Sequence, residues 1–471
     1  MERQSALTTE TSSNRKWWVF LAVGIGTFMS ALDSSVVNII LPVLRNYFKS
    51  DVASVEWAVV VYLLVVSSLL LTFGRLGDLR GHKGMYAGGF LIFVAASAVC
   101  GLSPTVVVLV AARTVQAVGA AMLFANAPAI LTRSFPPQQR GQALGLQAMM
   151  TYLGLTVGPS LGGWLTQTIS WRAVFYINVP VGLLAFTLSL AFIPAEKPGA
   201  AQVERFDWPG ALLFSAGLVA LLLGLNQGDA WGWTSPAVLF CAAAALILLG
   251  GFLRIEMRMP SPMLDLSLFR QRVFSASTAS AVLNYVCLYC VIFLMPFYLL
   301  QGRGLNPAQA GLLLTAQPII MAITAPISGA LSDRIGSRLL STLGMLVMAA
   351  GLFLLSTLKS DSSNGAILAG LAVTGLGTGM FISPNTSALM GSAPRQRQGI
   401  ASGILATARN VGMVLGVGLA GAILTSVMAR LGDTRLGNNA LFTAVHTGLL
   451  VGVGVALGGA LISSIRGTVK S

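Results

Sequence analysis

The chain of 471 residues is too apolar to be a soluble protein. Hydrophobic residues make up 55% of it, charged residues only 9%, and the mean hydropathy is +0.79, whereas a soluble domain carries about 25% charged residues. The apolar stretches are roughly 20 residues long, which is the length that crosses a bilayer as a helix. Continuous runs of this length exclude a β-barrel, whose strands alternate over about ten residues. The composition therefore predicts an all-α integral membrane protein.

Fourteen apolar segments follow one another along the chain, and each is expected to cross the lipid bilayer. They are 17–42, 55–74, 84–103, 105–131, 141–165, 172–193, 209–227, 236–254, 273–300, 307–331, 338–358, 365–388, 399–427 and 441–464. The net charge of +14 does not indicate nucleic acid binding, because most Lys and Arg residues fall in alternate connecting segments. This positive-inside pattern predicts that both termini lie in the cytoplasm.

Two internal repeats divide the chain. The sequence GRLGDLRGHKG, from Gly74, matches GALSDRIGSR, from Gly329, and the glycines of the fifth span recur in the thirteenth. The repeats predict two six-helix bundles with two further helices inserted between them. The expected division is a disordered cytoplasmic N-terminus at 1–16, a first bundle at 17–193, a linker with the two inserted helices at 194–272, a second bundle at 273–464 and a cytoplasmic C-terminus at 465–471.

Five segments resemble motifs of the major facilitator superfamily, in particular its fourteen-span drug:proton antiporters of the EmrB/QacA type. They are LDSSVVNIILP from Leu32, GRLGDLRGHKG from Gly74, RTVQAVGAA from Arg113, GLTVGPSLGG from Gly154 and WRAVFYINVPVG from Trp171. The resemblance covers residues 17 to 464. It implies a major facilitator fold, no enzymatic activity, no cofactor, and export of amphipathic drugs or antibiotics in exchange for protons by alternating access. The implied location is the bacterial cell (inner) membrane.

One carboxylate lies deep in a predicted span, in the sequence SALDSSVV. This is Asp33, and Arg113 is expected at a similar depth on the fourth span. Burial raises the pKa of a carboxylate, whereas a nearby guanidinium lowers it, so a side chain that alternates between two such environments can bind and release a proton. Asp33 is therefore the predicted proton-coupling acid, with Arg113 as its partner. The alternative is a static buried ion pair that holds two helices together.

The repeated loop motif is expected to form a conformational latch. A carboxylate there can accept hydrogen bonds from the N-terminus of a neighbouring helix and pair with a basic side chain. The residues assigned to this role are Gly74, Asp78, Arg80, Gly81, Lys83, Asp333 and Arg334. The alternative is a clasp that stays closed throughout the cycle.

The third motif is expected to be a tightly packed, kinked segment of the fifth span. Small residues allow helices to approach closely in lipid, and proline removes one backbone hydrogen bond. The residues are Gly154, Gly158, Pro159, Gly162 and Gly163. The resemblance associates this segment with antiporters, which favours antiport over symport.

Polar residues within the spans are candidates for a substrate cavity. They are Gln116, Asn126, Gln147, Tyr152, Asn284, Tyr285, Tyr289, Gln317, Asn385 and Arg409. The alternative for each is an interhelical hydrogen bond, and for Arg409 it is helix packing or snorkelling. Because Asp33 is the single acid well inside a span, the expected substrates are monovalent lipophilic cations or neutral compounds rather than dications.

Other possibilities stay open at this stage. The protein could export one metabolite, lipid or self-made antibiotic, or it could be a non-transporting scaffold or sensor. We expect a monomer, with a periplasmic adaptor if the source is Gram-negative. Cys287 and Cys290 have a C-x-x-C spacing, but the chain has no second pair, so we expect packing cysteines and no metal site.

Overall fold

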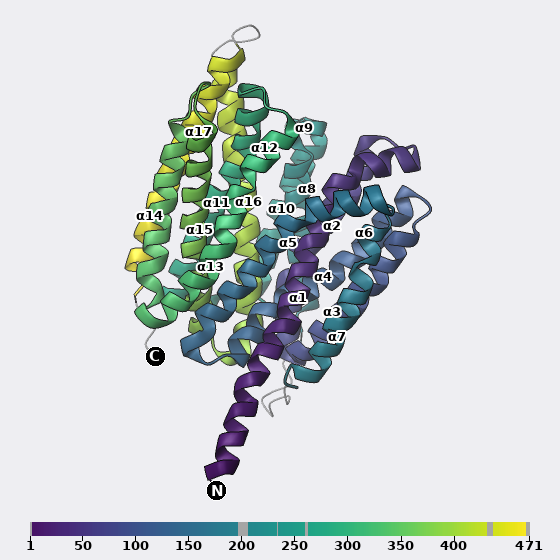
Figure 1. Ribbon diagram of the computed structural model, residues 1–471, viewed down its shortest axis with the longest axis vertical. Helices are drawn as coiled ribbons and strands as arrows, with labels where there is room; N and C mark the ends of the chain where they lie inside the picture. Colours follow the sequence, from purple (N-terminus) through teal and green to yellow (C-terminus); the bar gives the residue numbers. More distant parts are fainter. Residues whose placement is uncertain (1, 196–205, 233, 260–261, 431–436, 468–471) are drawn as a thin grey trace. The chain divides into compact units, whose positions relative to one another are not determined.

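The computed structural model describes residues 2–195, 206–232, 234–259, 262–430 and 437–467, and all regular structure in these ranges is helical (Figure 1). The helices are α1 (Glu2–Phe48), α2 (Val52–Arg80), α3 (His82–Leu102), α4 (Val106–Ser134), α5 (Arg140–Thr168), α6 (Ala173–Tyr176), α7 (Asn178–Phe192), α8 (Trp208–Asn226), α9 (Gly228–Trp231), α10 (Pro236–Glu256), α11 (Arg272–Pro296), α12 (Pro307–Leu314), α13 (Ala316–Ile335), α14 (Ser337–Ser356), α15 (Asn364–Ser392), α16 (Gln398–Arg430) and α17 (Gly437–Ile465). Three short 3₁₀-helices, η1 (Pro137–Gln139), η2 (Leu266–Arg270) and η4 (Arg395–Arg397), and one π-helix, η3 (Phe297–Gly302), lie between them.

The predicted all-α membrane fold is confirmed. Among the described residues, 13 helices are long and apolar enough to cross a membrane. The remaining predicted span, 141–165, lies in α5, which is 29 residues long. Its glycine, glutamine and threonine residues lower its mean hydropathy. Two spans consist of paired helices, because the regular α-helical hydrogen bonding is interrupted between α6 and α7 and between α12 and α13.

The N-terminal segment differs from its prediction. Residues 1–16 were expected to be disordered, but α1 already begins at Glu2. The physical reason is that adding residues to an existing helix avoids the cost of nucleation, and this segment contains good helix formers such as Ala6 and Leu7. The other predicted boundaries stay predictions, and residues 196–205 of the linker and 468–471 of the C-terminus lie outside the described residues.

The first of two compact units comprises Met1–Pro137, Met150–Ser267 and Ala393–Ala406. In it, α3 and α2 pack on α4, and α7 packs on α1 and α3. The inserted helices α8 and α10 pack on each other, and α8 also packs on α2.

The second unit comprises Gln138–Met149, Leu268–Ser392 and Thr407–Ser471. Here α15 packs on α13 and α14, and α17 packs on α14 and α11. The unit repeats a detail of the first: Gly81 ends α2 with φ of 94°, and Gly336 ends α13 with φ of 89°. A positive φ favours glycine, which explains why both copies of the repeated motif carry glycine at this position.

Candidate proton-coupling site

Asp33 is completely buried in α1 and accepts three hydrogen bonds. Its Oδ2 accepts from Arg113 Nη1 at 2.5 Å, and its Oδ1 accepts from Gln116 Nε2 at 3.0 Å and from Asn178 Nδ2 at 2.8 Å. All three contacts come from donors, which is the pattern of an ionised carboxylate because a protonated acid would have to donate once. The structure thus brings together the two charges that the sequence placed at similar depth.

Arg113 is held independently of the carboxylate. Its Nε donates to the carbonyl oxygen of Ala58 at 3.0 Å, and its Nη1 donates to Gln116 Oε1 at 2.8 Å. Its guanidinium carbon lies 4.0 Å from the centre of the Tyr62 ring, a cation–π contact. The arginine would therefore keep partners on α2 and α4 if Asp33 became neutral.

Gln116 links the ion pair to α3. Its Nε2 donates to Ser97 Oγ at 2.7 Å as well as to Asp33. Gln116 was predicted to line a substrate cavity, and the structure instead places it within the buried network. The glutamine fixes the carboxylate and the guanidinium at the same time.

Three members of this network were not singled out from the sequence: Asn178, Ser97 and Tyr62. Asn178 lies inside the motif-like segment WRAVFYINVPVG, and an amide in such an apolar run is a usable signal. A serine in a membrane helix gives no comparable signal, because its hydroxyl can donate to a carbonyl oxygen of its own helix, as Ser97 Oγ does to Phe93 O at 2.7 Å. A single tyrosine gives no comparable signal either. Only the packing of α2 and α3 against α4 reveals them.

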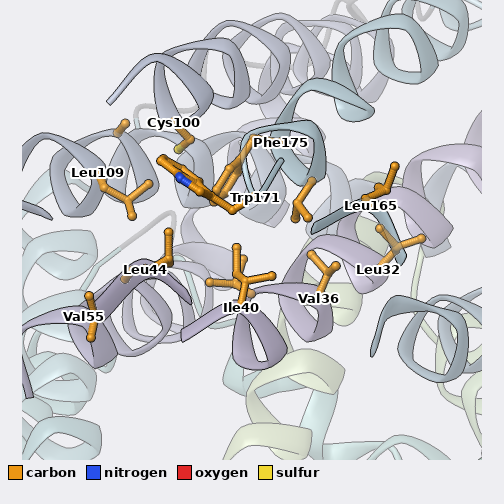
Figure 2. Close-up of a cluster of buried hydrophobic side chains, with 14 residues drawn as sticks. Leu32, Val36, Ile40, Leu44, Val55, Cys100, Leu109, Leu165, Trp171 and Phe175 are labelled. Atoms are coloured by element: carbon orange, nitrogen blue, oxygen red, sulfur yellow. The ribbon is translucent and has the colours of Figure 1, made fainter. Parts of the chain in front are cut away.

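A cluster of 14 buried hydrophobic side chains borders the ionic network (Figure 2). It extends along α1 from Leu32, next to Asp33, to Leu44, and Trp171 and Phe175 lie across from α1. Ala112 belongs to it and precedes Arg113 in α4. Because these side chains exclude water on this side, electrostatic interactions within the network are strong.

The glycine motif of α5 packs directly on the stretch of α1 that carries Asp33. A Cβ on Gly154 would lie 2.6 Å from the carbonyl oxygen of Phe28, and one on Gly158 would collide with Ser35 Oγ. Gly162 likewise faces Val36, and Ser35 Oγ donates to Gly154 O at 3.4 Å. The predicted close packing is present at three of the four glycines, whereas Gly163 has open space around it. Pro159 lies inside the same helix.

Asp78, at the end of α2, caps the N-terminus of α16 within the first unit. Its two carboxylate oxygens accept from the backbone amides of Gly399 and Ile400, each at 2.8 Å. Arg133 Nη2 lies 3.2 Å and His82 Nε2 3.3 Å from Asp78 Oδ1. Gly74, one turn earlier, meets Gly399 so closely that a Cβ on either would collide with the other's carbonyl oxygen.

Asp333 makes the corresponding contact within the second unit. Its Oδ1 accepts from Gly141 N at 2.8 Å and its Oδ2 from Gln142 N at 2.9 Å, so it caps the N-terminus of α5. The expected helix-end contact is therefore present for both copies of the motif.

The basic partners in these loops differ from the prediction. Lys83 donates to the carbonyl oxygen of Leu190 at 2.7 Å, and Arg80 and Arg334 are exposed. The basic side chains next to Asp78 are His82, which belongs to the motif, and Arg133, which lies on α4.

Several predicted cavity residues are instead engaged in helix packing. Asn126 Oδ1 lies 2.6 Å from His82 Nδ1, Gln317 Nε2 donates to Thr374 Oγ1 at 3.3 Å, and Asn284 Nδ2 lies 3.4 Å from Met345 Sδ. The alternative of interhelical hydrogen bonds describes these residues better. Gln147 is buried, whereas Tyr152, Tyr285, Tyr289 and Arg409 are half-buried.

Asn385 belongs to a second buried arginine site that the sequence did not reveal. Arg466, just after α17, is 1% exposed, and its Nη1 donates to Asn385 Oδ1 at 3.0 Å and Ser277 Oγ at 3.4 Å. Its Nη2 donates to Ser341 Oγ at 3.3 Å. Burial lowers the pKa of Arg466 to about 10, with a further contribution from Arg338, so the side chain is still cationic at neutral pH.

The fold defines a protein with many membrane-spanning helices, and comparison with known proteins identifies its family. The family model described as Major Facilitator Superfamily matches residues 23–269 and 277–432. The chain therefore belongs to the major facilitator superfamily.

Its similarity to individual relatives extends over most of the chain. It is 36% identical to the riboflavin transporter RibZ of Clostridioides difficile, covering 85% of this chain and 87% of that protein. It is 34% identical to the tetracenomycin C resistance and export protein of Streptomyces glaucescens, covering 89% and 77%. It is 31% identical to the multidrug resistance protein Stp of Mycobacterium tuberculosis, covering 86% and 75%.

Two solved structures share the fold. One is the human organic anion transporter MFSD10, with a TM-score of 0.66 at 13% identity, covering 95% of this chain and 99% of that one. The other is the proton:xylose symporter XylE, with a TM-score of 0.66 at 15% identity, covering 96% and 95%.

Proposed function

We propose that this transporter is a proton-coupled antiporter of the fourteen-span drug-exporter type, which expels amphipathic compounds from a bacterial cell by alternating access. The observation that carries the proposal is the fully buried Asp33 with three donors on its carboxylate. An ionisable side chain at this depth is costly to place in a membrane, and such residues usually act in ion or proton pathways.

The proposed coupling step is proton exchange at the Asp33 carboxylate. Protonation of Oδ2 removes the charge that attracts Arg113 Nη1, while Ala58 O, Gln116 Oε1 and the Tyr62 ring continue to hold the arginine. The link between α1 and α4 is then weakened without leaving the guanidinium unpartnered. Proton release restores the link and returns α1 to its starting position.

The glycine contacts would transmit this change from α1 to α5. Gly154 and Gly158 pack against the turn of α1 that contains Asp33, with almost no free space. A small displacement of α1 therefore has to move α5 as well, because close-packed interiors deform little. We propose that the Asp78 contact with α16 opens and closes during the same cycle, as a latch.

The proposed substrates are monovalent lipophilic cations or neutral amphiphiles. Relatives named for multidrug resistance and for tetracenomycin C export support this class. The half-buried Tyr152, Tyr285, Tyr289 and Arg409 remain our candidates for contact with substrate. We further propose a monomer in the cell (inner) membrane, with both termini in the cytoplasm.

A second candidate is transport of one metabolite, favoured by the similarity to a protein named as a riboflavin transporter. A panel of structurally unrelated cations and neutral dyes separates the two. Transport of several unrelated compounds supports the drug exporter, whereas transport of a single flavin-like compound supports the dedicated carrier.

Everted membrane vesicles test the proposed coupling. An acidic lumen should drive accumulation of ethidium by the wild-type protein, and Asp33→Asn should abolish it. Cys287→Ser is a matched control, because Cys287 is also fully buried in a membrane helix. Accumulation that is insensitive to the pH gradient, or that survives Asp33→Asn, would contradict the proposal. Uptake into right-side-out vesicles along an inward proton gradient would instead indicate a symporter.

A further inference from the structure

The turn between α15 and α16 is held from two directions within the first unit. On one side, Asp78 of α2 accepts from the amides of Gly399 and Ile400. On the other, Arg397 in η4 forms an ion pair with Asp265, which belongs to the segment that follows the inserted helices. Arg397 and Gly399 are two residues apart, so both contacts act on the same helix start.

Residues 262–267, which carry Asp265, are held by local contacts. Asp265 Oδ1 accepts from Ser267 N at 3.0 Å, and Glu256 Oε1, at the end of α10, accepts from Met263 N at 3.1 Å. Glu256 and Met263 are buried, and the Asp265 side chain is 8% exposed. The carboxylate that meets Arg397 is therefore fixed in position relative to α10.

The inserted helices are in turn fixed to α2. Helix α8 packs on both α10 and α2, and Ser215 Oγ of α8 donates to the carbonyl oxygen of Ser68 in α2 at 3.0 Å. A closed chain of contacts thus runs from α2 through α8 and α10 to Asp265, then to Arg397 and the start of α16, and back to α2 through Asp78. The start of α16 cannot leave α2 without breaking the Asp265–Arg397 pair or loosening the inserted helices.

We propose that the two inserted helices act as a second clasp on the α2–α16 contact, with Asp265 and Arg397 as its positioning residues. This inference rests on the proposed alternating-access function and gives the insertion a role in it. The clasp adds a partly buried ion pair to the two amide contacts of Asp78, and so favours the state in which the start of α16 is held against α2.

Hydrogen–deuterium exchange of the purified full chain in detergent tests the clasp without substrate or pH gradient. The amides of Gly399 and Ile400 should exchange about two- to fivefold faster in Arg397→Gln, the gain expected from losing one partly exposed ion pair. Arg397 is suited to substitution because its side chain is 40% exposed, so the variant should fold. Asp361→Asn, at an exposed position, is the control and should leave the exchange rates of the Gly399 and Ile400 amides unchanged.

A charge exchange completes the test. Asp265→Arg alone should accelerate exchange at the α16 start, and Asp265→Arg combined with Arg397→Asp should bring it back toward the wild-type rate. Unchanged exchange in Arg397→Gln, or no recovery in the double variant, would overturn the clasp. Because this readout does not involve Asp33, failure of the clasp and failure of proton coupling remain separate results.

Discussion

Each compact unit contains an arginine that is at most 1% exposed, Arg113 in the first and Arg466 in the second, and the two are held in different ways. In the first unit, Arg113 is 0% exposed and faces the carboxylate of Asp33. In the second, Arg466 is 1% exposed, and within the described residues its partners are the neutral oxygens of Asn385, Ser277 and Ser341. The same charged group is thus satisfied once with a counter-ion and once without.

This contrast bears on what Asp33 is for. If a buried arginine in this fold required a carboxylate, Asp33 could be explained as a structural partner. Arg466 shows that neutral acceptors suffice, and Arg113 already has two of them in Ala58 O and Gln116 Oε1. We therefore propose that the acid has a further use, because proton exchange is the chemistry that a carboxylate adds over an amide.

The glycine packing is alike in the two units, but the acid occurs in only one of them. Gly154 of α5 faces Phe28, Ala31 and Leu32 of α1, and Gly412 of α16 faces Val282, Tyr285 and Val286 of α11 in the same pattern. In this correspondence the position of Asp33, two residues after Ala31, is taken by Cys287, two residues after Tyr285. The repeat therefore preserves the packing but places the acid in one copy alone.

The largest effect is expected for Asp33→Asn. The amide can still accept a hydrogen bond from Arg113, as Asn385 does from Arg466, so the protein should fold with a near-normal thermal midpoint. Proton-driven transport should fall by roughly 100-fold or more, the usual scale for losing a proton-transfer group. A variant that fails to fold would show that Asp33 is structural and would break the comparison.

Arg466→Met is expected to lower stability but to leave proton coupling intact, the reverse of Asp33→Asn. Removal of the guanidinium leaves Asn385, Ser277 and Ser341 with unsatisfied buried oxygens, so the free energy of unfolding should fall by about 2–5 kcal/mol. The pH dependence of transport should nevertheless keep the wild-type midpoint. A shifted midpoint, measured in reconstituted vesicles, would mean that Arg466 also takes part in coupling.

Substitution of the two helix-end carboxylates, Asp78 and Asp333, should also affect transport more strongly in the first unit than in the second. Asp78 lies beside both Arg133 and His82 in addition to its two amides, whereas Asp333 accepts from two amides and interacts electrostatically with Arg140. Asp78→Asn should lower the transport rate about tenfold and Asp333→Asn about threefold, since charge-assisted hydrogen bonds are the stronger ones. Equal effects of the two substitutions would remove this distinction.

The smallest effect is expected from a pair of glycine substitutions in α5. Gly158→Ala adds a methyl group that collides with Ser35 Oγ, whereas Gly163→Ala meets open space. The first should cost about 1–3 kcal/mol of stability through overpacking and slow transport, and the second should leave both unchanged. Thermal unfolding and vesicle uptake of the two variants check this directly.

Much of this organisation could be predicted from residues alone, because lipid imposes strict rules. The helical spans follow from hydropathy, and the pairing of Asp33 with Arg113 was expected from their positions in the predicted spans. What could not be predicted is which polar groups meet across helices. Asn178 completes the Asp33 site, Arg133 replaces the nearby loop arginines at Asp78, and Asn385 serves Arg466 rather than a cavity. Such pairings depend on helix rotation, which a single sequence does not reveal.

Proton exchange at Asp33 can be followed by infrared difference spectroscopy of the reconstituted protein during pH-driven turnover. We expect a protonated-carboxyl band that appears and disappears with the cycle, is absent in Asp33→Asn and is unchanged in Arg466→Met. A carboxylate at Asp33 that keeps one ionisation state through turnover would contradict this expectation.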